Sequence, residues 1–289
     1  MNVLILDSTF HIKNKNGLIS VLNYLQYKYH FGNINDIPNY DVIYSPNHPL
    51  DPSKYPSKKF IFGPHFSVFP NHKINLLNNK YNNAIYLQPS KWAANVWINM
   101  GVNHIPVKFM PFAVNTEIFA PSSHESETTR NSVFIYFKGR KTDELNFLKK
   151  FLNQRNIEYK IFDYLKKYPE EEYINYLKKS KYGIWLGIHE SQGFALEEAL
   201  STNIPLLVWN VTSMNQEEGY NYPDIFGTSI PYWDDRCGEF FYEEKEFDSK
   251  YTEFINKLSL YEPRQFILEN LSVKKCGEYL KELIVNISK

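Results

Sequence analysis

Residues 188–209 read IHESQGFALEEALSTNIPLLVW and carry the clearest pattern in the chain. A strand is predicted to end near Leu186, a short loop follows, and a helix is predicted to begin around Gln192 and Gly193. The apolar run after Pro205 predicts another buried strand. A strand, a glycine-containing loop, a helix and a second strand are one unit of a parallel α/β sheet.

The same alternation extends outward in both directions. The sequence predicts strands at 2–7, 41–44, 59–62, 84–88, 107–110, 132–137, 159–162, 182–186 and 205–208, and helices at 17–31, 91–100, 142–153, 170–179, 193–200, 250–258 and 273–287. Strands that alternate with helices favour open parallel sheets, in which ligands bind beyond the carboxyl ends of the strands.

A polar segment divides the chain into two α/β halves. Residues 121–131 read PSSHESETTRN, without a single aliphatic or aromatic side chain. Such a break is typical of an interdomain linker. We therefore expect an N-terminal domain over 1–121, a linker over 122–131, a C-terminal domain over 132–265 and a C-terminal helical segment over 266–289.

Composition excludes several classes of protein. The 32 basic and 32 acidic side chains balance, without the basic surplus of a nucleic-acid binder. No apolar run approaches the roughly 18 residues of a membrane helix, and the apolar start at 2–7 is predicted to be a strand rather than a signal peptide. Cys237 and Cys276 are isolated, so a reducing, cytoplasmic compartment is expected. The chain contains no Asp-x-Asp motif, and no metal site is predicted.

Two glutamates flank the predicted helix start. Glu190 lies in the loop before the helix, and Glu198 lies about two turns along it. The backbone N–H groups at a helix start, together with the helix dipole, bind anions such as a diphosphate. Gly193 lets the backbone approach such an anion closely. A single glutamate is most often a solvated helix residue, so the role of this pair depends on the pattern around it.

The pattern resembles a known signature. Glu190-x7-Glu198, together with Ser191, Gly193 and the proline at 205, is similar to the motif of retaining glycosyltransferases of the two-domain GT-B fold. In that family the motif is roughly E-S-x-G-x-x-x-x-E-A-x-x-x-x-x-P, followed by a strand.

Three further segments carry the resemblance. Residues 138–141 (KGRK) follow a strand, like the family's G-R segment, and residues 109–121 (FMPFAVNTEIFAP) resemble its interdomain stretch. Residues 90–92 (SKW) resemble the S-x-W that opens the preceding helix. This chain departs from the family after the arginine, because Glu144 and Leu145 stand where the family usually has a lysine.

The resemblance implies a fold, an activity and partners. The fold is α/β, with two Rossmann-like GT-B domains that face each other across a cleft, and the final helix crosses back to the N-terminal domain. The activity is transfer of a sugar from a UDP- or GDP-sugar to a glycan or glycoconjugate acceptor in polysaccharide biosynthesis. The anomeric configuration is retained, and neither a metal nor another cofactor is required. Nucleic acid is not an expected partner, and peripheral membrane contact stays open.

The resemblance also assigns roles to side chains. Arg140, with either Lys141 or Lys138, would hold the donor's diphosphate. Glu190 would accept hydrogen bonds from hydroxyls of the donor sugar, and Glu198 from both ribose hydroxyls. The donor-binding positions expected at the helix start are Ser191, Gln192, Gly193 and Phe194.

One histidine completes the expected catalytic set with Glu190 and Arg140. Family members commonly place a histidine of the N-terminal domain near the transferred sugar. His65, in the loop after the strand at 59–62, is the first choice for this role. His11 and His48 are the second choices, and His189 has the weakest claim to a direct role.

Two other classes of function stay open. A glycoside hydrolase would use Glu190 and Glu198 as its carboxylate pair, at a separation of about 5–10 Å. Eight residues of helix span about 12 Å, which is long for such a pair and favours transfer. A catalytically silent GT-B-like protein that binds a glycan or acts as a scaffold would keep the fold without the chemistry.

Overall fold

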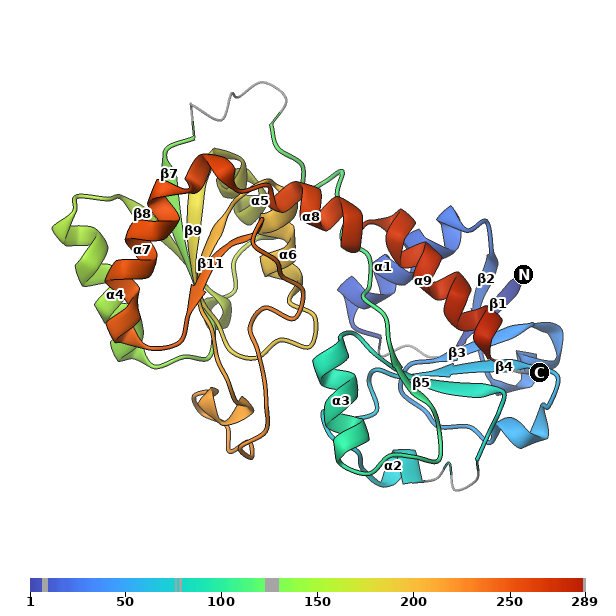
Figure 1. The fold of residues 1–289 in the computed structure, drawn as a ribbon. Helices are drawn as coiled ribbons and strands as arrows, with labels where there is room; N and C mark the ends of the chain where they lie inside the picture. Colours follow the sequence, from blue (N-terminus) through green and yellow to red (C-terminus); the bar gives the residue numbers. More distant parts are fainter. Residues whose placement is uncertain (7–9, 76, 78–79, 123–129, 288–289) are drawn as a thin grey trace. The chain divides into compact units, whose positions relative to one another are not determined.

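The computed structural model describes residues 1–6, 10–75, 77, 80–122 and 130–287. The chain forms two compact units, each built around one sheet (Figure 1). Unit 1 comprises Met1–Ala113 and Leu271–Lys289, and unit 2 comprises Val114–Asn270. Residues 123–129 of the predicted linker lie outside the described residues.

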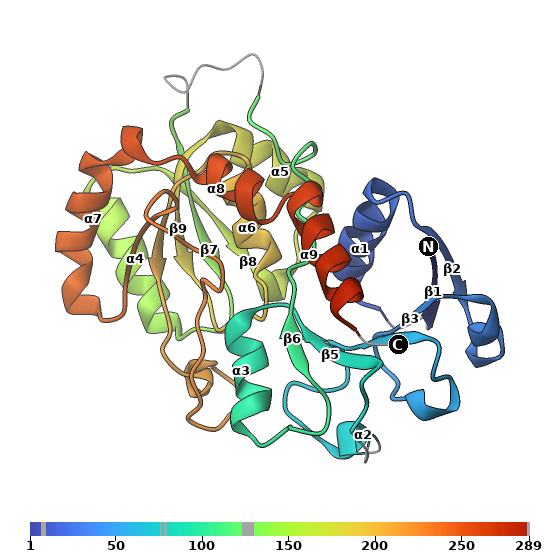
Figure 2. The same ribbon diagram turned by 45° about the vertical axis from the view of Figure 1, so that its right-hand side comes forward.

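Unit 1 contains a parallel sheet in the strand order β2-β1-β3-β4-β5-β6. The edge strand β6 is visible in Figure 2. The predictions of strands at 59–62 and 84–88 are confirmed residue for residue. The helices and strands of this unit are β1 (Asn2–Leu6), α1 (Ile12–Tyr24), β2 (Lys28–Gly32), β3 (Val42–Ser45), β4 (Lys59–Phe62), α2 (His72–Asn75), β5 (Ala84–Gln88), α3 (Lys91–Asn99), β6 (Val107–Phe109) and α9 (Val273–Asn286).

The predicted helix at 17–31 is wrong at both ends. Helix α1 begins five residues earlier and ends at Tyr24, and Gln26 then adopts a left-handed backbone with φ of 56°. The chain turns there and forms β2, which pairs in parallel with β1 along its whole length. The aromatic side chain of Tyr29 happens to continue the helical spacing, but residues 28–31 (KYHF) also alternate as a strand does. Backbone pairing with the edge of β1 selects the strand over the helix for these residues. The local sequence pattern carries no information about that partner strand.

The final helix belongs to unit 1. Helix α9 packs along α1, as Figures 1 and 2 both show. Its buried face consists of Cys276, Gly277, Leu280 and Ile284. Gly277 is needed for the close approach, because a Cβ there would lie 2.9 Å from the Tyr24 ring. The ends of the chain are therefore packed together in one unit.

Unit 2 contains a second parallel sheet in the order β11-β10-β9-β7-β8. The predictions of a strand at 132–137 and a helix at 170–179 are confirmed residue for residue. The helices and strands of this unit are β7 (Ser132–Phe137), α4 (Thr142–Gln154), β8 (Tyr159–Asp163), α5 (Glu170–Lys179), β9 (Ser180–Leu186), α6 (Phe194–Ser201), β10 (Leu206–Trp209), β11 (Gly238–Phe241), α7 (Phe247–Asn256) and α8 (Pro263–Asn270).

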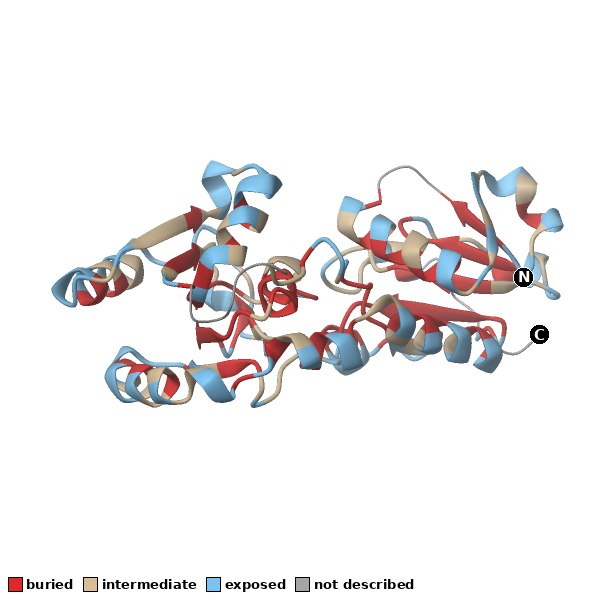
Figure 3. Cartoon of the chain, turned by 90° about the horizontal axis from the view of Figure 1, so that it is seen from above, coloured by how far each residue is buried: buried red, intermediate tan, exposed pale blue. Residues whose placement is uncertain are grey.

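The two faces of this sheet bury alternate side chains of each strand. On β7, Val133 and Ile135 belong to the core cluster that helices α4 and α7 complete. The intervening Phe134 and Tyr136 contact Tyr173 of α5 on the other face. Both faces are covered by helices, so the central strands are apolar along most of their length, and Figure 3 shows buried residues concentrated along the strands.

Arg264 of α8 fastens the start of unit 2. Its guanidinium donates to the carbonyl oxygens of Thr116 and Phe119 at 3.1 Å each and of Ser201 at 2.6 Å. The Ser201 hydroxyl donates to the same Phe119 oxygen at 2.7 Å. The segment that enters unit 2 is thus tied to the carboxyl end of α6.

Three findings concern features that the sequence singles out. Cys237 and Cys276 are both buried. Within the described ranges, no helix combines the length and apolarity needed to cross a membrane. The same residues contain no group of three or more His, Cys, Asp or Glu side chains placed to hold a metal ion.

Candidate functional site

Three loops of unit 2 meet at one edge of its sheet. Strands β7, β9 and β10 are adjacent and parallel, so the segments that follow Phe137, Leu186 and Trp209 leave the sheet on the same side. This is the edge at which open parallel sheets bind ligands. Most of the site residues expected from the sequence lie in the first two of these loops.

A half-buried ion pair joins the first two loops. Lys138 Nζ donates to Glu190 Oε1 at 2.6 Å, and the two side chains are only 18% and 16% exposed. The ammonium group also lies 4.5 Å from the centre of the Tyr164 ring. Burial alone would lower the pKa of Lys138, but attraction to Glu190 and the hydrogen bond with it outweigh burial and raise the pKa. Lys138 is therefore a cation at neutral pH.

The third loop contributes a residue that the sequence did not single out. Glu217 Oε2 lies 3.6 Å from His189 Nδ1, and the N–H of Glu218 donates to the Gly139 oxygen at 2.8 Å. Burial raises the pKa of the Glu217 carboxyl, Lys138 lowers it, and Glu190 raises it further. Glu217 follows β10 in a segment without helical or strand periodicity. The only local signal is the polar run NQEE at 215–218.

His189 is a neutral side chain in this cluster. Its pKa falls to about 4, first because it is buried and second because Lys138 lies nearby. Its ring also meets the Tyr222 ring edge-on at 5.3 Å. Because the imidazole is neutral, Lys138 is the cation among Lys138, His189, Glu190 and Glu217.

Helix α6 begins beside Glu190. Its N-cap, Gly193, has a φ of 92°, which only glycine adopts without strain. A Cβ built on Gly193 would lie 3.5 Å from Glu190 Cβ, so the two residues are neighbours in space. The N–H groups of the first helical turn, from Phe194 onward, have no carbonyl partner within the helix. The helix start, Glu190 and Lys138 thus lie in one place.

The other expected positions at the helix start differ in exposure. Ser191 is exposed, whereas Gln192 is 3% exposed and donates from Nε2 to Glu197 Oε2 at 3.0 Å. The Glu197 side chain is buried in the first turn of α6, and its Oε1 has no hydrogen-bond partner among the described residues. Burial raises the pKa of Glu197 far above its usual range, the bond from Gln192 opposes this, and Glu198 and Glu190 add to it. Glu197 is therefore a neutral acid and adds no negative charge at the helix start.

Glu198 is buried near tyrosines of α5 and of the loop before it. It is 5% exposed, so the default expectation of a solvated helix glutamate is wrong here. Its charge contributes to the raised pKa values of Tyr168 and Tyr173, in both of which burial is the larger cause. Glu198 therefore lies near Tyr168, in the loop before α5, and Tyr173 of α5.

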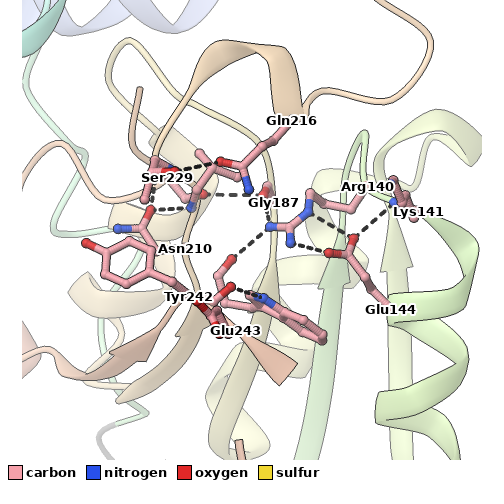
Figure 4. A network of polar contacts seen from close by, with 12 residues as sticks. Arg140, Lys141, Glu144, Gly187, Asn210, Gln216, Ser229, Tyr242 and Glu243 are labelled. Atoms are coloured by element: carbon pink, nitrogen blue, oxygen red, sulfur yellow. Dashed lines mark hydrogen bonds and ion pairs between the residues drawn. The ribbon is translucent and has the colours of Figure 1, made fainter. Parts of the chain in front are cut away.

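Arg140 holds strand ends together. Its Nε and Nη2 donate to the two carboxylate oxygens of Glu144 at 3.0 and 2.5 Å. Its Nη1 donates to the carbonyl oxygens of Gly187, just beyond β9, at 3.1 Å and of Trp209, the last residue of β10, at 3.0 Å (Figure 4). Arg140 is only 4% exposed. Lys141, in contrast, is an exposed residue whose backbone N–H donates to Glu144.

His65 lies in unit 1, in the loop after β4. Its Nε2 is 3.1 Å from Asn14 Nδ2, and its ring packs edge-on against Phe10 at 5.7 Å. Burial, and then the proximity of His11, lower the pKa of His65 to about 4. The side chain is therefore neutral at pH 7. Of the second choices, His11 lies directly before α1, and His48 accepts a hydrogen bond from Ser45 through its carbonyl oxygen at 2.6 Å.

Comparisons with known proteins give structural relatives only. No family profile and no curated sequence matches the chain. Among solved structures, the chain is similar to the lipopolysaccharide outer core galactosyltransferase WaaB in its apo form, at 14% identity and a TM-score of 0.53, with 99% of each chain covered. It is also similar to Anabaena HepE in complex with UDP, at 10% identity and a TM-score of 0.60, covering 99% of this chain and 100% of that one.

A third similar structure is the N-terminal domain of Candida albicans trehalose-6-phosphate phosphatase. The identity is 10% and the TM-score 0.60, and the match covers 100% of this chain and 97% of that domain. All three matches run across both units of the chain, and each unit is a parallel α/β sheet with helices on its faces. The chain therefore has the GT-B fold, with two Rossmann-like units in one polypeptide.

Proposed function

We propose that this protein is a glycosyltransferase that moves a sugar from a nucleoside-diphosphate sugar to a glycan or glycoconjugate, with retention and without a metal. One observation carries the proposal. Lys138 pairs with Glu190, Glu190 lies against Gly193 at the start of α6, and Glu198 follows about one turn along the same helix. The loop after β7 thus brings a cation to Glu190, and the start of α6 and a second carboxylate follow Glu190 within the next eight residues.

The chemistry of the leaving group fits these residues. Cleavage of the bond between sugar and phosphate builds negative charge on the departing nucleoside diphosphate. The positive end of the α6 dipole and the cations of residues 138–141 stabilise that charge more in the transition state than in the ground state. Burial strengthens this effect because the local dielectric constant is low.

The two carboxylates fit the two ends of a nucleotide sugar. Glu190, beside the helix start, accepts hydrogen bonds from hydroxyls of the donor sugar. Glu198, farther along α6, accepts from the ribose hydroxyls. The neighbouring Glu197 is neutral and does not repel the diphosphate between them. In this arrangement unit 2 is the donor domain.

The acceptor is assigned to unit 1. His65 lies at the carboxyl edge of that sheet, and its neutral imidazole can donate or accept a hydrogen bond at pH 7. Two similar structures support this class of reaction, since one is a galactosyltransferase and another is a complex with UDP.

A second candidate is a GT-B-like domain without transferase activity. The similarity to the N-terminal domain of a trehalose-6-phosphate phosphatase favours it, because that domain belongs to a protein named for phosphate removal and not for sugar transfer. The engagement of Arg140 with Glu144 favours it too, since the arginine of the motif is occupied within the protein. A glycoside hydrolase would need no nucleotide at all.

A donor panel separates these functions. The protein is incubated with UDP-glucose, UDP-galactose, UDP-N-acetylglucosamine, GDP-mannose and GDP-fucose, and release of UDP or GDP is measured with EDTA present. Thermal shifts with UDP and GDP report binding. Transferase function predicts stabilisation by one diphosphate and slow hydrolysis of a matching donor. Stabilisation without hydrolysis or transfer indicates the silent domain, and cleavage of nitrophenyl glycosides without a nucleotide indicates a hydrolase.

Glu198→Gln tests the proposed ribose contact. The variant keeps the shape of the side chain, so the fold is retained, but an amide accepts hydrogen bonds through one oxygen only. We expect affinity for the nucleoside diphosphate to fall about tenfold, which corresponds to one charge-assisted hydrogen bond of ~1.4 kcal/mol. Titration calorimetry measures the change, and wild-type affinity would remove Glu198 from the donor site.

A further inference from the structure

The loop at 138–141 contains three cations, and they differ in how far each is already engaged within the protein. We infer that the diphosphate ligand at the helix start is Lys138, that Glu190 holds its ammonium group in the absence of donor, and that Arg140 positions the strand ends instead of binding phosphate. The inference rests on the proposed transferase function and deepens it.

Arg140 has little capacity left for a ligand. A guanidinium has five N–H groups, and four hydrogen bonds commit Nε, both hydrogens of Nη1 and one of Nη2. To bind a phosphate with its two-pronged geometry, Arg140 would have to leave Glu144 or the carbonyl oxygens of Gly187 and Trp209. Either step leaves buried polar groups without hydrogen-bond partners.

The charge of Arg140 is also compensated. Glu144 receives two parallel hydrogen bonds from the guanidinium, the strongest geometry for an arginine and a carboxylate. Glu144 stands at one of the positions where the resembling family usually has a lysine. In this chain the exchange converts the arginine from a surplus cation into half of an ion pair. Figure 4 shows the guanidinium enclosed between the strand ends and the first turn of α4.

Lys138 differs in both respects. Its ammonium has three donors, of which one is committed to Glu190. Glu190 in turn lies against Gly193, the N-cap of α6, so the residue that holds the ammonium group is a neighbour of the helix start. The two positive features therefore converge on one place, where a diphosphate would contact both.

Lys141 lacks such a placement. It is exposed at the N-cap of α4, where its backbone N–H donates a hydrogen bond to the Glu144 carboxylate. A solvated lysine gains little from a phosphate that it meets in water. Lys141 is therefore the matched control, a lysine of the same loop three residues from Lys138.

Two glutamine variants distinguish the two cations. Glu190→Gln removes the carboxylate that competes with phosphate for Lys138, and Glu144→Gln removes the one that holds Arg140. The measured quantity is the ratio of affinities for UDP and uridine, or for GDP and guanosine, by titration calorimetry on the full chain. This ratio isolates the contribution of the diphosphate from that of the nucleoside.

We expect Glu190→Gln to raise this ratio severalfold even though it lowers turnover, and Glu144→Gln to leave the ratio unchanged while lowering the melting temperature. We expect Lys138→Met to reduce the ratio about tenfold or more, and Lys141→Met to reduce it less than twofold. A ratio that rises in Glu144→Gln, or that is unaffected in Lys138→Met, overturns the inference and returns the diphosphate to Arg140.

The proposed function fails separately. If the wild-type protein binds neither UDP nor GDP, the donor site itself is refuted and the assignment of Lys138 falls with it. If the wild-type protein binds one of them and Lys138→Met binds it equally well, only the assignment of Lys138 is refuted.

Discussion

At the scale of single residues, burial sets the charge of three ionisable side chains near the strand ends. His65 and His189 are neutral bases with pKa values near 4, and Glu197 is a neutral acid. Charged forms of these groups would each lose hydration in the folded protein. Their neutrality therefore makes stability depend on pH in opposite directions.

The two histidines predict a loss of stability in acid. A histidine of the unfolded chain has a pKa of about 6.5, so the unfolded chain takes up a proton between pH 6.5 and 4 that the folded chain excludes. The free energy of unfolding should fall as pH falls through this window. His65→Gln should flatten the fall for unit 1 and His189→Gln for unit 2, measured by hydrogen exchange of β4 and β9 amides. An unchanged pH dependence in both variants would contradict the prediction.

Glu197 predicts the reverse trend. Its pKa is about 4.3 in an unfolded chain and is raised in the folded protein, so stability declines as pH rises above that lower value. Glu197→Gln cannot titrate and still accepts the hydrogen bond from Gln192. Urea unfolding at pH 5, 7 and 9 should show a variant that is more stable than wild type by about 1 kcal/mol or more at pH 9, with a smaller gain at pH 5. A gain that is equal at all three pH values would exclude the buried carboxyl as its cause.

At the scale of elements, glycines mark where strands and helices must start. Gly238 opens β11 with a φ of 134°, and a Cβ there would lie 2.0 Å from the Leu206 oxygen of β10. Gly219 also has a positive φ, 83°, but a Cβ there would meet no atom within 4 Å. Both positions have a positive φ, but only Gly219 has room for a Cβ atom.

This pair gives a matched prediction for β11. Gly219→Ala should cost about 1–2 kcal/mol, the strain of a left-handed backbone alone. Gly238→Ala adds a clash with the neighbouring strand and should cost about 3 kcal/mol or more, seen as a lower melting temperature of unit 2. Equal losses in the two variants would show that β11 can shift away from β10.

Most elements can be predicted from the sequence, and the exceptions have physical reasons. The strand at 84–88 and the helix at 170–179 are found to the residue, because their periodicity and their flanking prolines are local. Strands β2 and β11 are missed, because each lies at a sheet edge and owes its conformation to a partner strand. The candidate site likewise has a part that the sequence predicts and a part that it does not. The segment 190–198 is a continuous motif, whereas Glu217 reaches it from a loop that carries no pattern.

At the scale of the whole molecule, one unit contains both ends of the chain. Unit 1 is completed by α9, whose Leu280 is 1% exposed and lies on the face turned to the core. Residues 271–287 must therefore join residues 1–113 before unit 1 can close, whereas unit 2 is one continuous segment. This order of assembly suggests a direct test.

Leu280→Ala should destabilise unit 1 alone. A buried leucine reduced to alanine costs about 3 kcal/mol, from lost burial and from the cavity left behind. Val285, which is 66% exposed on the same helix, provides the control, and Val285→Ala should change stability by less than about 0.5 kcal/mol. Hydrogen exchange of β1 should rise in the first variant while that of β7 stays constant. Equal effects on both strands would mean that the units unfold together.

The sequence alone determines that two α/β halves exist and that a glutamate motif follows a strand in the second half, since strands, helices and their capping residues depend on near neighbours. The tertiary structure decides which charges are available. It ties Arg140 to the carbonyl oxygens of Gly187 and Trp209, joins Lys138 to Glu190, and buries Glu197 as a neutral acid. These outcomes depend on which loops meet at the sheet edge, and that meeting is set by the order of strands distant in the chain.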